Sequence, residues 1–213
     1  MRKIFLGILH SFLMRGFLRI IVGVKYQNRE VLKKSKQFII VSNHNSHLDS
    51  MALLASLPVS QIANTHPVAA GDYFGQSLMR AFFTRFFVNA ILIPRTQIKG
   101  GQHPIRMMSE ALAKGNSLIL FPEGSRGEPE KMQEFKKGIG LLLKMNPTVP
   151  YIPVFMKGMG KILPKGERLL VPFDSYVYFG EPTLCKGASV DEIVEEIEKS
   201  VLQLAGGTPA DKN

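Results

Sequence analysis

The chain has little cysteine and no tryptophan: Cys185 is the only thiol among its 213 residues. A single cysteine excludes an internal disulfide, so we expect a reducing compartment. Cys185 lies in a late, loop-like stretch, which makes it a poor candidate nucleophile. The chain also lacks internal repeats and low-complexity runs. Because 45% of its residues are hydrophobic, one folded domain is expected rather than a disordered chain.

Acidic residues are scarce in the first half of the chain. Residues 1–100 contain 13 lysines and arginines but only three acids, whereas residues 101–213 contain 14 of each kind. The net charge of +10 therefore comes from the first half. Such a one-sided field attracts polyanions, either nucleic acid or an anionic bilayer. A basic binding protein without catalysis stays an alternative, although the chain lacks the interleaved aromatic and basic residues of a recognised RNA-binding motif.

Residues 4–24 form an apolar run that is long enough to cross a bilayer. Arg15 and Arg19 near its middle would be costly in hydrocarbon, and they also interrupt the core of a signal peptide. At helical spacing, the polar residues form one narrow stripe: Lys3, Gly7, His10, Ser11, Arg15 and Arg19. We expect residues 1–27 to be an amphipathic membrane anchor whose stripe faces the headgroups. A helix packed on the rest of the domain is the alternative.

A second apolar run, Phe74–Phe87, contains five phenylalanines with two arginines among them. Its composition is compatible with a core helix, an acyl-chain groove or a bilayer contact. The sequence leaves these three interpretations open.

Short β-rich runs alternate with helical patterns, which predicts an α/β domain over residues 28–205 with a mixed or largely parallel sheet flanked by helices. Expected strands cover residues 38–42, 67–70, 90–93, 117–121, 152–156 and 175–179. Expected helices cover 48–56, 74–87, 104–114, 138–145 and a final one that opens at Ser189. Ser189 with Glu192 forms a capping box for that last helix. Residues 206–213 are expected to be a loose tail.

A polar motif, Asn43-His44-Asn45-Ser46-His47-Leu48-Asp49, directly follows the strand expected at 38–42. Turn-to-helix geometry over five residues can fold the Asp49 carboxylate back onto the His44 ring, with Ser46 as the N-cap. A carboxylate that accepts the Nδ1 proton leaves Nε2 free to take a proton from a hydroxyl. Metal binding by His44, His47 and Asp49 is an alternative that no further His or Cys cluster supports. A polar helix cap is the simplest alternative.

Two further motifs follow other expected strands, and a third opens one. Phe121-Pro122-Glu123-Gly124-Ser125-Arg126-Gly127 is a turn whose two glycines let the backbone approach a ligand, and Arg126 provides a guanidinium suited to phosphate. It is not a serine-hydrolase elbow, because Glu123 occupies the first glycine position. Arg95 ends the strand expected at 90–93, and the prolines of residues 149–154 indicate a rigid strand entrance.

In chain order, these blocks resemble the glycerolipid acyltransferase family that includes the lysophosphatidic acid acyltransferases. That family has the pattern N-H-x-x-x-x-D, an apolar strand ending in Arg, F-P-E-G-[ST]-R and V-P-x-x-P-V. All four blocks occur here within residues 38–157. The resemblance implies that His44 is the general base and Asp49 orients it. It also implies that Arg95, Glu123, Gly124, Ser125 and Arg126 bind the acceptor, with Lys136 and Lys137 as contacts for the donor or a phosphate.

The resemblance further implies direct transfer from acyl-CoA or an acyl carrier protein to a lysophospholipid, with lysophosphatidic acid giving phosphatidic acid. Pro94 departs from the family, where many members have a more polar residue. Another lysolipid or a glycerol-phosphate-like acceptor therefore stays an alternative. No metal or bound cofactor is expected. The expected partner is an anionic membrane at its cytoplasmic face, and nucleic acid is not expected.

Overall fold

The computed structural model describes residues 1–46, 48–71, 82, 84–94, 103–128, 130–162 and 173–206. Its centre is a sheet with the strand order β1-β7-β6-β2-β5-β3-β4. The strands are β1 (Val24–Gln27), β2 (Ile39–Ser42), β3 (Thr65–Ala70), β4 (Ile91–Ile93), β5 (Ser117–Leu120), β6 (Tyr151–Lys157) and β7 (Ser175–Phe179). Among the pairings of these described strands, β6–β7 alone is antiparallel. The predicted α/β class with a mixed, largely parallel sheet is confirmed.

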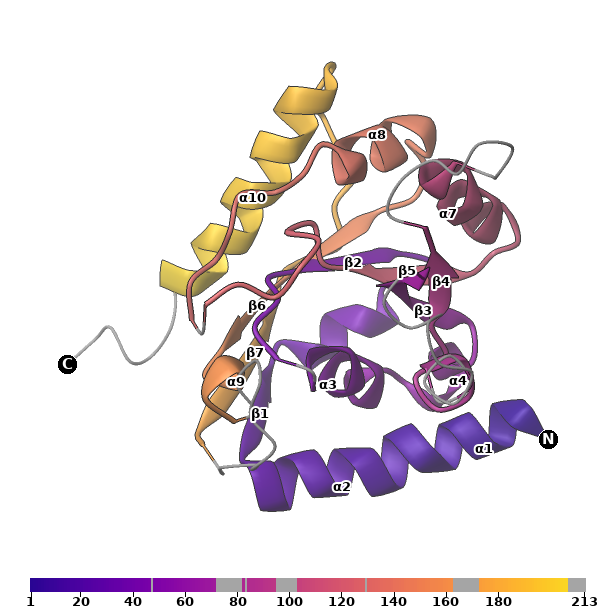
Figure 1. Cartoon of the computed structure of the whole chain (residues 1–213), viewed down its shortest axis with the longest axis vertical. Helices are drawn as coiled ribbons and strands as arrows, with labels where there is room; N and C mark the ends of the chain where they lie inside the picture. The colour runs from indigo at the N-terminus through magenta and orange to yellow at the C-terminus, as the bar shows by residue number, and fades with distance from the viewer. Residues whose placement is uncertain are drawn as a thin grey trace.

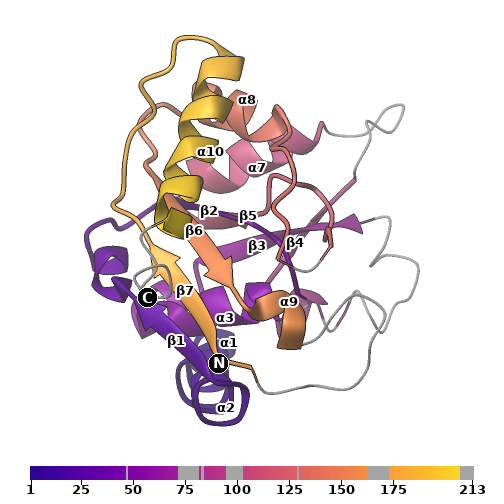
Figure 2. The ribbon, with the colours of Figure 1, turned by 90° about the vertical axis from the view of Figure 1, so that its left-hand side faces the viewer.

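Helices cover both faces of the sheet (Figures 1 and 2). One face carries α7 (Pro104–Ala113), α8 (Gly138–Met145) and α10 (Val190–Gly206), and the other carries α3 (Asp49–Ser56), with α4 (Val59–Ile62) beside it. Each side has its own core, and the strands contribute alternate residues to the two cores because their side chains alternate in direction. Ile40 and Ile119 face the α3 side, whereas Ile39 and Leu118 face the α10 side.

The predicted capping box of α10 is confirmed. The Glu192 backbone N–H donates to Ser189 Oγ, and the Ser189 N–H donates to the Glu192 carboxylate. The buried face of this helix includes Ile193, Ile197 and Val201, as the spacing predicts. Two short elements, α9 (Met159–Ile162) and the 3₁₀ turn η3 (Arg29–Lys33), connect strands.

The N-terminal segment is one continuous helix, Arg2–Val22, built from α1 (Arg2–Ile8), η1 (Leu9–Met14), α2 (Arg15–Phe17) and η2 (Leu18–Val22). Among the described residues it is the one helix long and apolar enough to cross a membrane. Gly23, with φ +88°, ends it in the left-handed region that favours glycine. Residues 24–27, the end of the segment predicted as an anchor, form edge strand β1, which the sequence patterns did not predict.

The polar stripe of this helix faces the domain, so the prediction that it faces headgroups is wrong for its middle. Gly7 and His10 are buried, and His10 Nε2 lies 2.8 Å from the carbonyl oxygen of Phe87. Arg15 donates to the carbonyls of Ala55 and Leu57 at 2.6 and 2.8 Å. These polar groups thus bond to backbone carbonyls of the domain.

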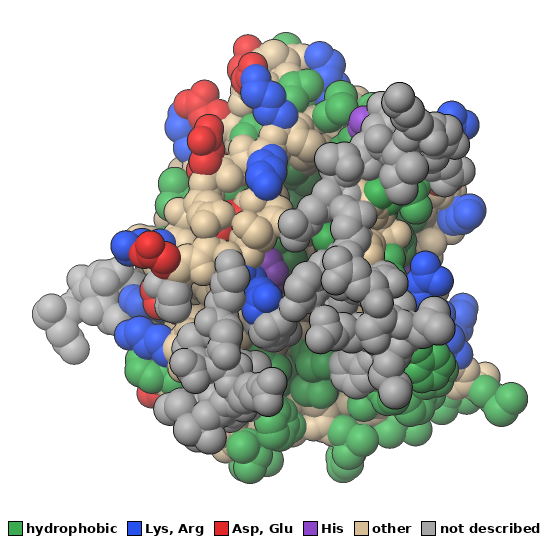
Figure 3. Space-filling view, in the orientation of Figure 1, with side chains coloured by type: hydrophobic (Ala, Val, Ile, Leu, Met, Phe, Trp, Pro, Cys, Tyr) green, Lys and Arg blue, Asp and Glu red, His purple; other side chains and the backbone are tan. Residues whose placement is uncertain are grey.

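The opposite side of the helix is apolar and open. Figure 3 shows hydrophobic side chains gathered along the edge of the molecule where this helix lies. We call this surface the apolar ridge; it consists of Ile4, Phe5, Ile8, Phe12, Leu13, Phe17, Ile20 and Ile21. Such a contiguous apolar surface is unusual on a soluble monomer.

Most of the Phe74–Phe87 run lies outside the described residues. Its described end packs against the N-terminal helix, because Phe86 and Phe87 contact the ring of Phe5 at centroid distances of 5.2 and 5.8 Å. Phe82 stacks on Phe86 and is exposed. This end of the run therefore extends the apolar ridge.

Candidate active site

The site lies where the parallel strands end. Strand β2 lies between β5 and β6, all three parallel, so the loops that follow them leave at one edge of the sheet. His44 follows β2, and Asp49 is the first residue of α3. His44 Nδ1 and Asp49 Oδ2 are 2.9 Å apart, with Asp49 fully buried and the His44 side chain 19% exposed. The predicted pairing of these side chains is present.

The Asp49 carboxylate also holds the backbone of the loop. Its Oδ2 accepts from the N–H groups of Asn45 and Ser46 at 2.7 and 2.8 Å, in addition to the His44 ring. Ser46 is not the N-cap that the sequence predicts: Leu48 is the capping residue, and Ser46 Oγ accepts from its N–H. One carboxylate oxygen thus fixes both the ring and the turn that carries it.

Asn43 secures the other end of the loop. Its side-chain amide donates to the Met156 carbonyl at 2.9 Å and accepts from the Met156 N–H at 2.8 Å, extending the β2–β6 pairing by one side chain. A buried amide with both partners satisfied fixes the direction in which the chain leaves the strand. This role was not predicted from the sequence, where its signal is an asparagine directly after an apolar strand.

Phe121, the first residue after β5, stacks on the His44 ring. The two ring centroids are 4.1 Å apart and the planes are inclined by 19°. Together with the bond to Asp49, this contact fixes the imidazole plane. Because Nδ1 donates to Asp49, Nε2 is the nitrogen that can accept a proton.

Glu123 lies under the loop and is 1% exposed. Its Oε1 accepts from the His44 backbone N–H at 3.0 Å. Burial raises the pKa of this carboxyl to about 7, and the nearby Asp49 charge adds to the increase, whereas the N–H groups of His44 and Gln133 oppose it. The resemblance implies acceptor binding by Glu123, but its described contact is to the protein backbone.

The rest of this turn is open. Gly124 and Ser125 are exposed, and Gly124 has φ +74°. A Cβ added to Gly124 would lie 2.6 Å from Lys136 Nζ, so the ammonium lies directly over the glycine. Arg126 is half-buried, and its Nη1 has no hydrogen-bond partner among the described residues. A guanidinium nitrogen without a partner and an ammonium group on the same turn are both suited to a phosphate.

The remaining predicted contacts differ in outcome. Lys137 forms an exposed ion pair with Asp191 of α10 at 2.8 Å, which raises the pKa of its ammonium. Arg95 and His47 lie outside the described residues.

Within the described ranges, no three His, Cys, Asp or Glu side chains gather as metal ligands would. Burial raises the pKa of the Cys185 thiol to about 12, which agrees with its rejection as a nucleophile.

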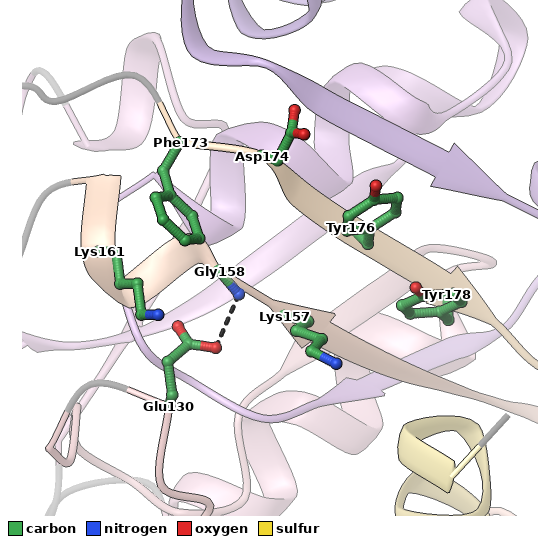
Figure 4. Close-up of a pocket in the computed structure, with 8 residues that line it drawn as sticks. All are labelled: Glu130, Lys157, Gly158, Lys161, Phe173, Asp174, Tyr176 and Tyr178. Carbon is green, nitrogen blue, oxygen red and sulfur yellow. Dashed lines mark hydrogen bonds between the residues drawn. The ribbon is translucent and has the colours of Figure 1, made fainter. Parts of the chain in front are cut away.

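The loop that begins with Phe121 is also hydrogen-bonded to the segment after β6. Glu130 accepts from the N–H groups of Gly158 and Gly160 at 2.7 and 3.0 Å. Glu130, Lys161, Tyr176 and Tyr178 line a cavity of about 460 Å³. Figure 4 shows Glu130 and Lys161 next to each other on one side of it, with Tyr176 and Tyr178 on the other. Glu130 has φ 63°, so this contact holds an unfavourable backbone conformation.

Comparison with known proteins agrees with this geometry. A sequence model of the Acyltransferase family matches residues 23–157, which span the strands and loops just described. The chain belongs to the Acyltransferase family. The resemblance indicated by the four motifs is confirmed, and the chain is an enzyme of the glycerolipid O-acyltransferase type.

Two relatives carry the name 1-acyl-sn-glycerol-3-phosphate acyltransferase. The protein from Limnanthes douglasii is 27% identical over 202 residues, which cover 92% of this chain and 68% of the relative. That from Pseudomonas aeruginosa is 26% identical over 180 residues, covering 83% and 66%. The solved acyltransferase PlsC from Thermotoga maritima has the same fold, with a TM-score of 0.77 at 24% identity, over 96% of this chain and 80% of that one.

Proposed function

We propose that this acyltransferase moves a fatty-acyl group from acyl-CoA or an acyl carrier protein to the free hydroxyl of lysophosphatidic acid, which gives phosphatidic acid. The observation that carries the proposal is the His44–Asp49 pair, held at 2.9 Å beside the Phe121–Arg126 turn. The names of the two relatives support the same acceptor.

In this mechanism, His44 Nε2 takes the proton of the acceptor hydroxyl while the hydroxyl oxygen attacks the carbonyl carbon of the thioester. The new C–O bond forms, the C–S bond breaks, and the proton passes from the imidazolium to the leaving thiolate. Asp49 stabilises the imidazolium through Nδ1. The transfer needs no acyl-enzyme, because the hydroxyl itself is the nucleophile.

Charge beside the pair supports a phosphate-bearing acceptor. Arg126 contributes a buried nitrogen without a described partner, and Lys136 contributes an ammonium over Gly124. A phosphate monoester provides several oxygens that can accept from both. Arg95 is proposed as a third contact on the basis of its place in the family motif alone.

We propose that the enzyme works on the cytoplasmic face of an anionic membrane, with the apolar ridge in the interface. The helix is hydrogen-bonded to the same domain at two places: Arg2, at its start, donates to Arg85 and Asn89, and Arg15, within it, donates to the loop after α3. A docked helix of this kind lies along the domain surface, which supports interfacial insertion rather than a span. The basic excess of the first half adds attraction to anionic lipids.

A panel of acceptors and donors tests the activity. Purified chain is given lysophosphatidic acid, lysophosphatidylcholine or glycerol 3-phosphate, each with acyl-CoA and with acyl carrier protein, and the lipid products are quantified. We expect phosphatidic acid as the main product. A main product from another acceptor would reassign the substrate, and no product from any pair would overturn the proposal.

Flotation with anionic vesicles tests the membrane contact. Phe12→Ser with Ile20→Ser removes two strongly exposed ridge side chains, whereas Leu202→Ser removes an exposed leucine on α10. We expect the ridge variant to lose most of its binding, because each buried aromatic or aliphatic side chain contributes about 1.5–3 kcal/mol, and the α10 variant to float like the wild type. Equal binding by all three proteins would place the contact elsewhere.

A further inference from the structure

The backbone of the catalytic loop is held by carboxylates from two different parts of the chain. Three consecutive N–H groups, those of His44, Asn45 and Ser46, all donate to carboxylates. Asp49, five residues after His44, accepts the second and third of them. Glu123 accepts the first, from the neighbouring loop after β5.

We propose that Glu123 is a positioning residue, which fixes the His44 backbone and thereby the imidazole, and that it is not a ligand of the acceptor. The proposal rests on the proposed function insofar as kinetics are used to test it. It assigns Glu123 a role different from the substrate binding that the family resemblance implies.

Burial and geometry carry this assignment. A side chain that is 1% exposed offers almost no surface to a lipid headgroup, and Oε1 is already bonded to His44. Without that acceptor the His44 N–H would be buried and unpaired, a cost that the loop would relieve by moving. The movement would reach the ring directly, because His44 carries both the N–H and the imidazole.

The exposure of the neighbouring residues contrasts with that of Glu123. Gly124 and Ser125, the next two residues, are exposed, and Arg126 is half-buried. One buried atom of each charged side chain, Glu123 Oε2 and Arg126 Nη1, has no partner among the described residues. The turn therefore divides into a buried residue that supports the loop and open residues that can contact substrate. A raised carboxyl pKa of about 7 agrees with a group held away from solvent and from cations.

Steady-state kinetics of Glu123→Gln and Glu123→Ala, with Arg126→Ala alongside, form the first test. The glutamine keeps an oxygen that can accept from the His44 N–H, so kcat should stay within about threefold of wild type. The alanine loses the acceptor, and kcat should fall on the order of 10²-fold, with KM for lysophosphatidic acid changed less than about threefold. If both Glu123 variants raise KM as Arg126→Ala does, Glu123 contacts the acceptor and the proposal is wrong.

NMR of the imidazole nitrogens gives a second readout that needs no turnover. The His44 signals are identified by their loss in His44→Ala. We expect the Nδ1–H signal to be kept in Glu123→Gln and shifted or broadened in Glu123→Ala; an unchanged signal in both would overturn the proposal. If the alanine variant does not fold, Glu123→Asp, which retracts the carboxylate by one methylene, takes its place with the same expected loss. A wild type inactive on every acceptor would refute the proposed function, while the NMR comparison would still decide the role of Glu123.

Discussion

The loop after β2 and the turn after β5 lie side by side but are built in opposite ways. In the first loop, the Asn43 side chain, the His44 ring and the N–H groups of residues 44–46 all have protein partners. In the second, Gly124 and Ser125 are exposed, and Arg126 has a nitrogen without a described partner.

This difference separates two tasks of the enzyme. A base must hold its ring in one orientation before substrate arrives, because reorganisation during the reaction raises the barrier. A phosphate-binding group must instead keep donors available, since the substrate supplies their partners. Under the proposed function, the buried loop is preorganised for chemistry, and the open turn is available for recognition of the acceptor. The variants below test that division.

His44→Ala should have the largest effect. A positioned general base contributes on the order of 10² to 10⁴ in rate, so kcat should fall by that factor while the melting temperature changes little. Activity on lysophosphatidic acid and thermal unfolding are measured together. Near-normal kcat with a folded protein would contradict the assigned base.

Asp49→Asn should come next. The amide oxygen can keep the N–H bonds of Asn45 and Ser46, but it cannot stabilise an imidazolium and can favour the wrong tautomer. We expect kcat to fall by roughly 10²-fold or more, with KM for the acceptor nearly unchanged. A change confined to KM would move Asp49 from the catalytic pair to the binding site.

Arg126→Ala should act on recognition. Losing hydrogen bonds from a charged donor costs about 1.5–3 kcal/mol each, so KM for lysophosphatidic acid should rise roughly 10- to 100-fold. An acceptor without a phosphate monoester should lose much less, and Ser125→Ala is the matched control on the same turn. An equal loss on both acceptors would assign Arg126 to support of the loop.

Arg15 and Arg19 lie one turn apart on the N-terminal helix, yet only Arg15 reaches carbonyls at the end of α3 in the described structure. Arg15→Gln should lower the melting temperature by roughly 5–10 °C, because two hydrogen bonds from a charged donor are lost. Arg19→Gln should leave it nearly unchanged and weaken binding to anionic vesicles about fivefold. Equal thermal shifts would contradict the different roles.

Glu123→Gln should have the smallest effect, visible as a pH dependence of stability. The folded pKa of about 7 lies above the ordinary value of 4.5, so the folded state binds the proton more tightly. In the wild type, the stability that the protonated Glu123 carboxyl contributes is fully present below about pH 4.5 and is lost as the pH rises through 7. The glutamine of the variant does not titrate. Its free energy of unfolding, relative to that of wild type, should therefore rise between pH 5 and 8, as measured by thermal unfolding. A constant difference would contradict the raised pKa.

Local patterns predicted much of the fold because they depend on near neighbours. Runs such as Ile39–Ser42 and Ser117–Leu120 are apolar on both faces, as strands covered on both sides must be. Edge strand β1 was missed because Val24–Gln27 is short, half exposed and directly follows the apolar helix. Its partner β7 lies about 150 residues away, so no local pattern reveals the pairing.

The sequence by itself determined the family and the proposed catalytic pair: the spacing of His44 and Asp49 allows one helix start to join them, and the motif order identifies the family. Tertiary structure alone decided which groups act on each other from distant segments. Glu123 reaches the His44 N–H only because β5 lies beside β2, and Arg15 meets the loop after α3 only because the helix docks there. Hydrophobic periodicity shows that a helix has a polar stripe and an apolar arc. Which of them faces the domain depends on the docked surface, whose carbonyls at Ala55, Leu57 and Phe87 contact the polar side chains.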